Sequence, residues 1–379
     1  MRMRLANRGP GRISLGPRAR LTTKLLIIAL GLALTLIRFP ASSVERFYST
    51  GFYSSLQSLL TTFSNLVPFS IADVLIVALA VGLPAWWIVR LKRTARGRRG
   101  QASGRLALHT TVLAAAVVCA FELLWGLNYQ RPPLTTKLDW DRQRVTFAAS
   151  VRLARVALDN VNAESAAAHA GEWPGDQEMR TRLHESFEQV VTELGNRPGF
   201  VPAEPKRSLL NLYLRTAGLA GFTNPFGHEV ILDPELLPFE KPYTLAHEWA
   251  HLAGFADESE ASFVGLLTCL RSDAPEIRYS AWLELYQHIG RPLEPGQDPN
   301  TLEPWPPLAP EVQDDLRAIS ERVRRHYSRT IGKAQAGVYD RFLKANRVEA
   351  GIASYGLLVR LLLGARFDEN WVPAQRQGR

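Results

Sequence analysis

Two histidines and a glutamate stand at a spacing that could build a metal site. His247, Glu248 and His251 form the pattern H-E-x-x-H. On an α-helix, residues four apart lie about 5–6 Å from one another between Cβ atoms, so both imidazoles can contact one ion. Glu248 lies about 100° round the helix, where it can meet a water on that ion without binding the ion itself. Zinc accepts imidazole and carboxylate ligands and keeps one position open in catalytic sites, so the pattern predicts a catalytic zinc centre.

A third protein ligand is expected shortly after this helix. Gly254 is a natural place for the helix to end in a left-handed turn. Three acids follow it, Asp257, Glu258 and Glu260. Asp257 can cap a second helix, with Glu260 at its third helical position. Glu258 is then the freest to bind the metal, although all three acids stay open as candidates.

The alternative for this segment is an ordinary amphipathic helix that carries two solvated histidines. The residues between and around the histidines argue against it, because most are apolar: Leu245, Ala246, Trp249, Ala250, Leu252 and Ala253. Such a helix should be buried on most sides. Buried histidines and a buried glutamate need partners, and a metal ion would supply them.

The longer segment His247–Ala261 (HEWAHLAGFADESEA) resembles the pattern H-E-x-A-H-x-x-G-x-x-x-E-x-E-A of an uncharacterised family of bacterial membrane proteins that are similar to zinc peptidases. Other segments that fit this family are Phe69-Ser70, Trp125–Arg131, Gly221–Gly227, Arg278–Ser280, Val338–Lys344 and Ser354–Gly356. The E-x-E-A segment also resembles the E-x-x-A-D element of gluzincin peptidases, whose first glutamate is the third zinc ligand. That match falls on Glu258. Ser262 stands where gluzincins have an aspartate that orients a histidine, so this orienting role is open to question.

The resemblance also implies a substrate-binding strand. In zinc peptidases of this kind, an edge strand beside the cleft pairs with an extended substrate backbone. The alternating residues His228–Asp233 favour a short strand just ahead of the zinc helix. By the resemblance, Asn224, His228 and Glu229 are candidate substrate-binding residues. A plain core strand is the alternative.

The expected reaction is hydrolysis of a peptide bond by a metal-bound water, with Glu248 as general base and then general acid. A tyrosine or histidine would stabilise the oxyanion. Tyr279, Tyr339 and His326 are available for this role, and Tyr279 is the preferred candidate. A zinc-binding envelope scaffold without turnover is the rival hypothesis, because the family has no assigned activity.

A protease that works inside the bilayer is a third hypothesis, which the sequence excludes. Lys241 and Asp257 bracket too few residues around the H-E-x-x-H pattern for a membrane span. The substrate, whether peptide or protein, is not indicated by any motif.

The excess of positive charge in this chain comes from two short segments. The net charge is +9 at pH 7. Arginine and lysine gather in the N-terminal tail and between Arg90 and Arg105, and the rest of the chain is mildly acidic. A nucleic-acid surface would not be limited to two short clusters beside apolar segments. This distribution indicates membrane topology and argues against a nucleic-acid partner.

Three apolar segments predict transmembrane helices at about 22–39, 71–89 and 106–127. The first is short and follows a basic tail, so a cleaved signal peptide is its alternative. We favour an uncleaved anchor, because further spans follow. Asp73 and Glu122 fall near the outer ends of their spans, where a structural role is the simpler reading.

The basic clusters predict the orientation of these spans. The positive-inside rule places the tail (residues 1–23) and the Arg90–Arg105 loop in the cytoplasm of a bacterium. The membrane domain then covers residues 24–130, and residues 131–379 form a domain in the periplasm or outside the cell. The segment Pro40–Pro68, rich in aromatics, could lie along the outer surface of the plasma membrane.

The fold class expected for the whole chain is mainly α. Three transmembrane helices should precede a zincin-like α+β outer domain, in which a short edge strand lies beside the H-E-x-x-H helix. Predicted helices of the outer domain are Arg142–Ala170, Met179–Leu194, Ser259–Leu270, Glu276–Ile289, Glu311–Arg329, Val338–Ala345 and Ile352–Leu363, with a proline-rich loop at Pro292–Pro310.

Overall fold

The computed structural model describes residues 16–289, 305–351 and 357–376. It is mainly helical and contains a small three-stranded sheet, in agreement with the expected class. The chain separates into two compact units. Unit 1 comprises residues 1–38 and 81–123, and unit 2 comprises residues 39–80 and 124–379. The predicted helix Ile352–Leu363 and loop Pro292–Pro310 lie partly outside the described residues.

Unit 1 is built from long apolar helices. Its elements are α1 (Pro17–Leu36), α5 (Leu83–Lys92), η3 (Arg96–Arg98) and α6 (Arg99–Leu124). A Cβ on Gly31 would lie 3.1 Å from the carbonyl oxygen of Ala115, so α1 and α6 approach closely at this glycine. The indole nitrogen of Trp87 donates a hydrogen bond of 3.0 Å to the hydroxyl of Thr110. Small residues and such interhelical bonds are the usual means by which membrane helices associate.

Three helical segments are long and apolar enough to cross a membrane: Arg18–Leu36, Ile71–Lys92 and Arg96–Leu124. They support the prediction of a membrane protein. The second segment joins α4 (Ile71–Val77) to α5 through the π-helical turn η2 (Ala78–Gly82). The first helix ends at Leu36, before the predicted end at residue 39, because an extended Ile37 and the nearby Pro40 do not continue it.

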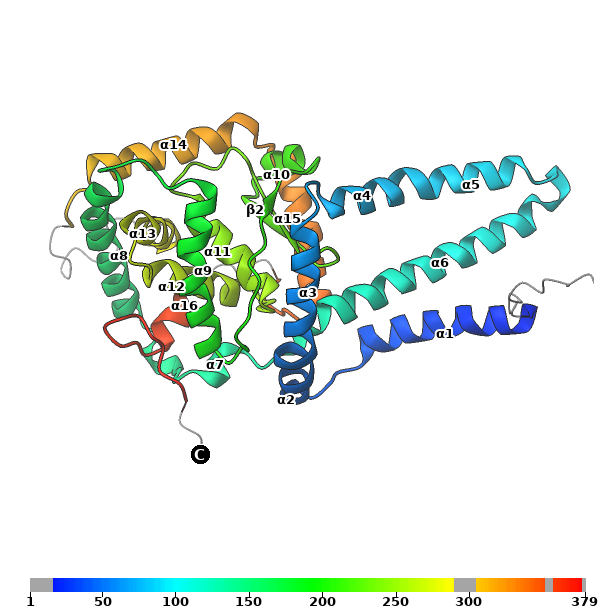
Figure 1. Cartoon of the computed structure of the whole chain (residues 1–379), viewed down its shortest axis with the longest axis horizontal. Coiled ribbons are helices and arrows are strands. Elements are labelled where there is room, and N and C mark those ends of the chain that lie inside the picture. The colour runs from blue at the N-terminus through cyan, green and yellow to red at the C-terminus, as the bar shows by residue number, and fades with distance from the viewer. Residues whose placement is uncertain (1–15, 290–304, 352–356, 377–379) are drawn as a thin grey trace, which may run out of the picture. The chain divides into compact units, whose positions relative to one another are not determined.

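Unit 2 packs its helices around α11 and α12 (Figure 1). Its longer helices are α3 (Tyr53–Asn65), α8 (Phe147–Ala168), α9 (Asp176–Glu193), α11 (Lys241–Leu252), α12 (Glu258–Leu270), α13 (Pro275–Ile289), α14 (Pro310–His326) and α15 (Arg329–Ala345). Its shorter ones are α2 (Ala41–Ser43), η1 (Val44–Phe52), η4 (Gly126–Gln130), α7 (Leu134–Lys137), η5 (Arg142–Arg144), α10 (Asn211–Ala217) and α16 (Leu357–Gly364). Helices α9, α12 and α13 pack against α11, and α8 packs on α13; together with α11 these helices supply most of the apolar core.

Helix α11 is buried because its apolar residues occur on nearly every side. Trp249 is fully buried, lies against the rings of Phe187 and Phe200, and donates a hydrogen bond of 3.0 Å to the carbonyl oxygen of Ala203. Gly265 of α12 faces the backbone of His247, where a Cβ would lie only 3.0 Å from the amide nitrogen. This close approach packs α12 directly against the histidine-bearing part of α11.

The sheet has the strand order β1-β3-β2. Strand β3 (Glu229–Leu232) pairs in parallel with β1 (Pro205–Lys206) and antiparallel with β2 (Gly221–Asn224). The prediction that His228–Asp233 is an edge strand is therefore wrong, because β1 occupies its second side. All four β3 residues are buried, as expected for a central strand. Strand β2 is the edge strand that lies beside α11.

Candidate metal centre

The turn between α11 and α12 brings an acid back to the two histidines. Gly254 has φ +87°, which confirms the left-handed turn predicted at this position. Asp257 caps α12, since its carboxylate accepts hydrogen bonds from the amides of Ser259 (2.9 Å) and Glu260 (3.4 Å). Glu258 is thereby the first residue of α12 and faces α11.

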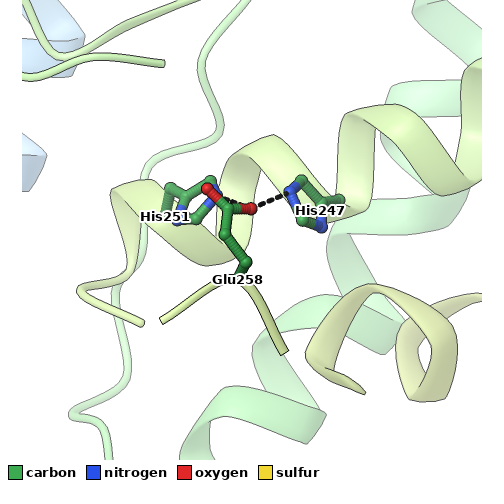
Figure 2. A group of neighbouring side chains, drawn as sticks. All are labelled: His247, His251 and Glu258. Carbon is green, nitrogen blue, oxygen red and sulfur yellow. Dashed lines mark ion pairs between the residues drawn. The ribbon is translucent and has the colours of Figure 1, made fainter. Parts of the chain in front are cut away.

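His247, His251 and Glu258 form the candidate metal centre, which we call the triad (Figure 2). Both Nε2 atoms lie 3.3 Å from Glu258 Oε2. The three potential ligand atoms lie within 4.8 Å of one another. Figure 2 shows the Glu258 carboxylate reaching the two imidazoles from the neighbouring segment. Of the three acids considered from the sequence, Glu258 is the one that lies here.

The other acid of α12 has a different partner. Glu260 accepts a hydrogen bond of 2.6 Å from the amide of Leu134. Burial raises the pKa of Glu260 to about 7. The Glu260 side chain therefore joins α12 to the start of α7. It does not bond back to the residue that caps α12, as the capping box suggested by the sequence would require.

The remaining ring nitrogen of each histidine also has a partner. His251 Nδ1 lies 2.9 Å from the carbonyl oxygen of Phe255, and His247 Nδ1 lies 3.3 Å from the hydroxyl of Ser262. The Phe255 carbonyl favours a proton on Nδ1 of His251, so Nε2 is the ring nitrogen available to a metal ion. Ser262 thus stands beside His247 at the position where gluzincins have an aspartate.

The donor set fits a zinc ion. Glu258 Oε2 is buried and accepts no hydrogen bond within the described part of the chain. Its neighbours are the two imidazoles, with which it forms ion pairs of 3.3 Å, and a cation shared by all three groups would stabilise the buried carboxylate. Burial alone would raise the pKa of Glu258. The adjacent His251 and His247 lower it by more than burial raises it, so the pKa lies well below the ordinary value. The carboxylate is therefore ionised, as a metal ligand must be.

Glu248 points to strand β2. Its Oε2 accepts a hydrogen bond of 2.6 Å from the Thr223 hydroxyl, and a Cβ on Gly221 would lie only 2.6 Å from its Oε1. Glycine at position 221 therefore leaves room for the carboxylate. Burial raises the pKa of Glu248, and the histidines and Thr223 only partly oppose this. A carboxylate in such a setting is suited to take up a proton.

The structure places Tyr339, not Tyr279, at the triad. The hydroxyl of Tyr339 donates a hydrogen bond to Glu258 Oε1. The hydroxyl of Tyr279 instead donates to Asp315 at 2.5 Å, and its ring is fully buried. His326 lies 3.2 Å from Glu235. Nothing in the sequence places α15 beside Glu258, so the choice among the three candidates requires the fold.

The three predicted substrate-binding residues are buried and serve the interior of unit 2. Glu229 accepts hydrogen bonds from Asn224 (2.9 Å) and from the amides of Ile71 (3.0 Å) and Ala72 (2.7 Å). It therefore caps the start of α4. His228 has a left-handed backbone (φ 46°), and burial lowers its pKa to about 4. None of the three side chains is accessible to a substrate in this arrangement.

Thr223 was not recognised from the sequence as a partner of Glu248. Threonine is common in strands, and only the position of β2 beside α11 gives this one its role. The sequence signal available was its place in the segment Gly221–Gly227, which fits the resemblance but states no chemistry of its own.

An ion pair fixes the C-terminal end of α11. The guanidinium of Arg131 donates to the carbonyl oxygen of Gly254 at 3.0 Å and to Glu45 at 2.7 Å. Lys137 also pairs with Glu45. Burial raises the pKa of Glu45, but Arg131 and Lys137 lower it by more, so the pKa of this carboxyl group lies below its ordinary value. The charged form of Glu45 is the one that stabilises the fold.

We predict a pH-dependent loss of stability in Glu45→Gln. A carboxyl group with a depressed pKa stabilises the fold above its unfolded pKa of about 4.5 and loses this contribution as the pH falls through its folded pKa. At pH 7 the variant should lose about 1.5–3 kcal/mol. Melting temperatures of both proteins should converge as the pH drops below about 4.5. A difference that is constant between pH 7 and pH 3 would contradict the role given to this ion pair.

Comparison with models of protein families matches residues 48–363 to one family, described as a protein of unknown function (DUF3810). The matched region includes the triad, Glu248 and the sheet. No curated protein and no solved structure matches the chain.

Proposed function

The chain belongs to the DUF3810 family of proteins of unknown function, and we propose that it is a membrane-anchored, zinc-dependent metallopeptidase that acts on the outer side of the membrane. The observation that carries the proposal is the position of Glu258 Oε2, which is buried and lies 3.3 Å from the Nε2 atoms of both histidines. Two imidazoles and one carboxylate are the ligand set of many catalytic zinc sites.

In this proposal His247, His251 and Glu258 hold the zinc ion. When bound, zinc would lower the pKa of a water molecule and polarise the substrate carbonyl group. Glu248 would take the proton of the attacking water on Oε1, the oxygen that Thr223 leaves free. It would then deliver this proton to the nitrogen of the leaving amine as the C–N bond breaks. The Thr223 hydroxyl would hold the carboxylate in position throughout.

Strand β2 would hold the substrate. It is an edge strand of the sheet, it lies beside α11, and its Gly221 abuts the Glu248 carboxylate. An extended peptide could add to its outer edge by backbone hydrogen bonds, the β-augmentation mode. Tyr339, whose hydroxyl reaches Glu258, would supply the hydrogen bond to the oxyanion. These assignments replace the sequence-based choice of His228–Asp233 and Tyr279.

The proposed location follows from charge and from the three apolar helices. The positive-inside rule puts the N-terminal tail and the Arg90–Arg105 loop in the cytoplasm. Three crossings then expose residues after about 130 to the periplasm or the cell exterior. The bilayer and a peptide or protein substrate are the partners of this proposal.

The proposal is tested by metal analysis of the purified full-length chain, followed by digestion of a peptide library with and without a chelator. We expect about one zinc ion per chain, and cleavage that disappears with the chelator and returns with added zinc. His247→Ala and Glu258→Ala should bind zinc at least about 100-fold more weakly.

Glu260→Gln is the matched control, because it changes an acid of the same helix that lies outside the triad and should keep its zinc. A chain that binds no zinc, or triad variants that bind it as tightly as wild type, would overturn the proposal. Zinc binding without cleavage of any peptide would favour the envelope scaffold.

A further inference from the structure

Helix α3 turns a polar face to the protein and an apolar face outward. Gln57, Thr61 and Ser64 are buried, whereas Phe63 is 60% exposed and Leu66, the residue after the helix, is 75% exposed. Ordinary surface helices of soluble domains show the opposite arrangement. A group of exposed apolar side chains on one face of a helix is typical of a surface that contacts protein or membrane.

Hydrogen bonds hold the polar face of α3 in place. Gln57 donates to the carbonyl oxygen of Val201 at 2.8 Å, and the Lys206 ammonium donates to the carbonyl oxygen of Ser64 at 2.7 Å. The helix cannot roll over to bury its apolar side without leaving these polar groups unpaired. The outward orientation of its apolar side chains is therefore built into the fold.

A second group of exposed apolar side chains flanks the start of the second membrane segment. The Asp73 carboxylate, in the first turn of α4, accepts a hydrogen bond of 2.9 Å from the amide of Leu209. Leu209 is 76% exposed and Leu212, in α10, is 67% exposed. Because α4 begins the apolar segment Ile71–Lys92, the bilayer surface must lie near these leucines if that segment crosses the membrane.

The metal helix is tied to α3 and to Trp125, the residue that follows α6. The hydroxyl of Tyr53, in α3, donates a hydrogen bond of 2.8 Å to the carbonyl oxygen of Leu252 in α11. The indole of Trp125 donates one of 2.8 Å to the carbonyl oxygen of His251. Both bonds hold the C-terminal end of α11, the end that carries His251, to segments next to the apolar membrane helices.

We propose that these apolar side chains rest in the headgroup region of the bilayer and that the metal centre acts on polypeptide segments held at the membrane surface. The surface, which we call the juxtamembrane face, consists of Phe52, Leu59, Phe63, Leu66, Leu209 and Leu212, all exposed. Lipid is chosen as the partner because the juxtamembrane face adjoins α4, the helix that begins the apolar segment Ile71–Lys92. The substrate class rests on the proposed peptidase function, whereas the lipid contact does not.

The lipid contact is tested with the full-length chain in phospholipid vesicles. Single cysteines placed at Leu59, Phe63 or Leu212 are labelled with the environment-sensitive fluorophore NBD, and quenching by lipids with a nitroxide near the headgroup is measured. The two native cysteines are buried, so wild type treated in the same way gives the background.

Val156 is the matched control position. It is an exposed apolar residue of α8, which lies on the side of unit 2 opposite α3 (Figure 1). We expect quenching at the three juxtamembrane positions at least about fivefold above that at Val156, because nitroxide quenching requires near-contact. Equal, weak quenching at all four positions would overturn the lipid contact.

The substrate class is tested with a peptide that wild type cleaves in solution, attached to a lipid anchor by flexible linkers of different lengths. If the metal centre lies at the membrane surface, cleavage in vesicles should persist with a linker of about five residues, roughly 17 Å when extended. Cleavage that requires about twenty residues, roughly 70 Å, would place the site far from the bilayer and overturn the proposal. Glu248→Gln is the inactive reference.

The two experiments separate this inference from the peptidase proposal. If wild type cleaves neither the free nor any anchored peptide, the peptidase function and the substrate class fall together, and the quenching result still decides the lipid contact. If wild type cleaves only free and long-linker peptides, the peptidase function stands and the membrane-surface substrate class is wrong.

Discussion

Glu248→Gln is expected to lower kcat/KM for a cleaved peptide by about 10²–10⁴-fold and to leave zinc bound. Glutamine has the shape of glutamate but cannot take up the proton of the attacking water. Thr223 can still donate to the amide oxygen, so the side chain should keep its position beside β2. Because Glu248 is not part of the triad, the metal content should stay at the wild-type value.

This variant separates an enzyme from a scaffold. The measurement pairs metal analysis with the rate of peptide cleavage, using Glu260→Gln as a control that should retain both. Full activity in Glu248→Gln would refute the role of Glu248 as general base. A second variant, Thr223→Val, removes the hydroxyl that holds the carboxylate and should cause a smaller loss, with zinc binding unchanged.

Glu229→Gln is expected to destabilise unit 2 by about 3–5 kcal/mol. The Glu229 carboxylate is fully buried and lies 3.1 Å from the ammonium of Lys206, which is itself buried. Burial alone would raise the pKa of Glu229. Hydrogen bonds from the backbone amides of Ile71 and Ala72 and from the side chains of Asn224 and Lys206 lower it by more, so the net pKa is below the ordinary value. The variant would leave the lysine charge buried without its counter-charge and would weaken the cap of α4.

The expected readout is a drop in melting temperature on the order of 10 °C, measured on the detergent-solubilised chain. Glu204→Gln is the matched control, because Glu204 pairs with Arg180 at the surface and should contribute less than about 1 kcal/mol. The double variant Glu229→Gln, Lys206→Met removes both charges and should recover part of the loss. Equal stability of Glu229→Gln and wild type would refute the capping role.

Glu229 also shows why the sequence misassigned a residue. By the resemblance, this glutamate ahead of the zinc helix is a candidate substrate-binding residue. The structure uses it to fix the start of α4, which lies more than 150 positions earlier in the chain. Nothing in the local pattern distinguishes an acid that faces a cleft from one that caps a distant helix.

The edge-strand prediction failed for a similar reason. Alternation within His228–Asp233 correctly indicated a strand, but strand order depends on pairing with distant segments. Lys206, more than 20 positions earlier, belongs to a two-residue strand that no periodicity argument can detect. Its pairing with β3 makes β3 the central strand and leaves β1 and β2 at the edges of the sheet.

The sequence by itself determined the parts that depend on local spacing. Helical periodicity places His247 and His251 on one face, Gly254 ends the helix in a left-handed turn, and Asp257 caps the next helix; all follow from residues within one or two turns of each other. The three apolar helices are likewise a matter of length and composition.

Only the tertiary structure decided which partners meet the metal site. Tyr339 reaches Glu258 from 81 positions away, and Thr223 reaches Glu248 from 25. Such contacts arise when helices and strands pack to bury their apolar faces, and packing does not depend on distance along the chain. A hydroxyl therefore becomes part of this site through the position of its helix or strand, which no short motif encodes.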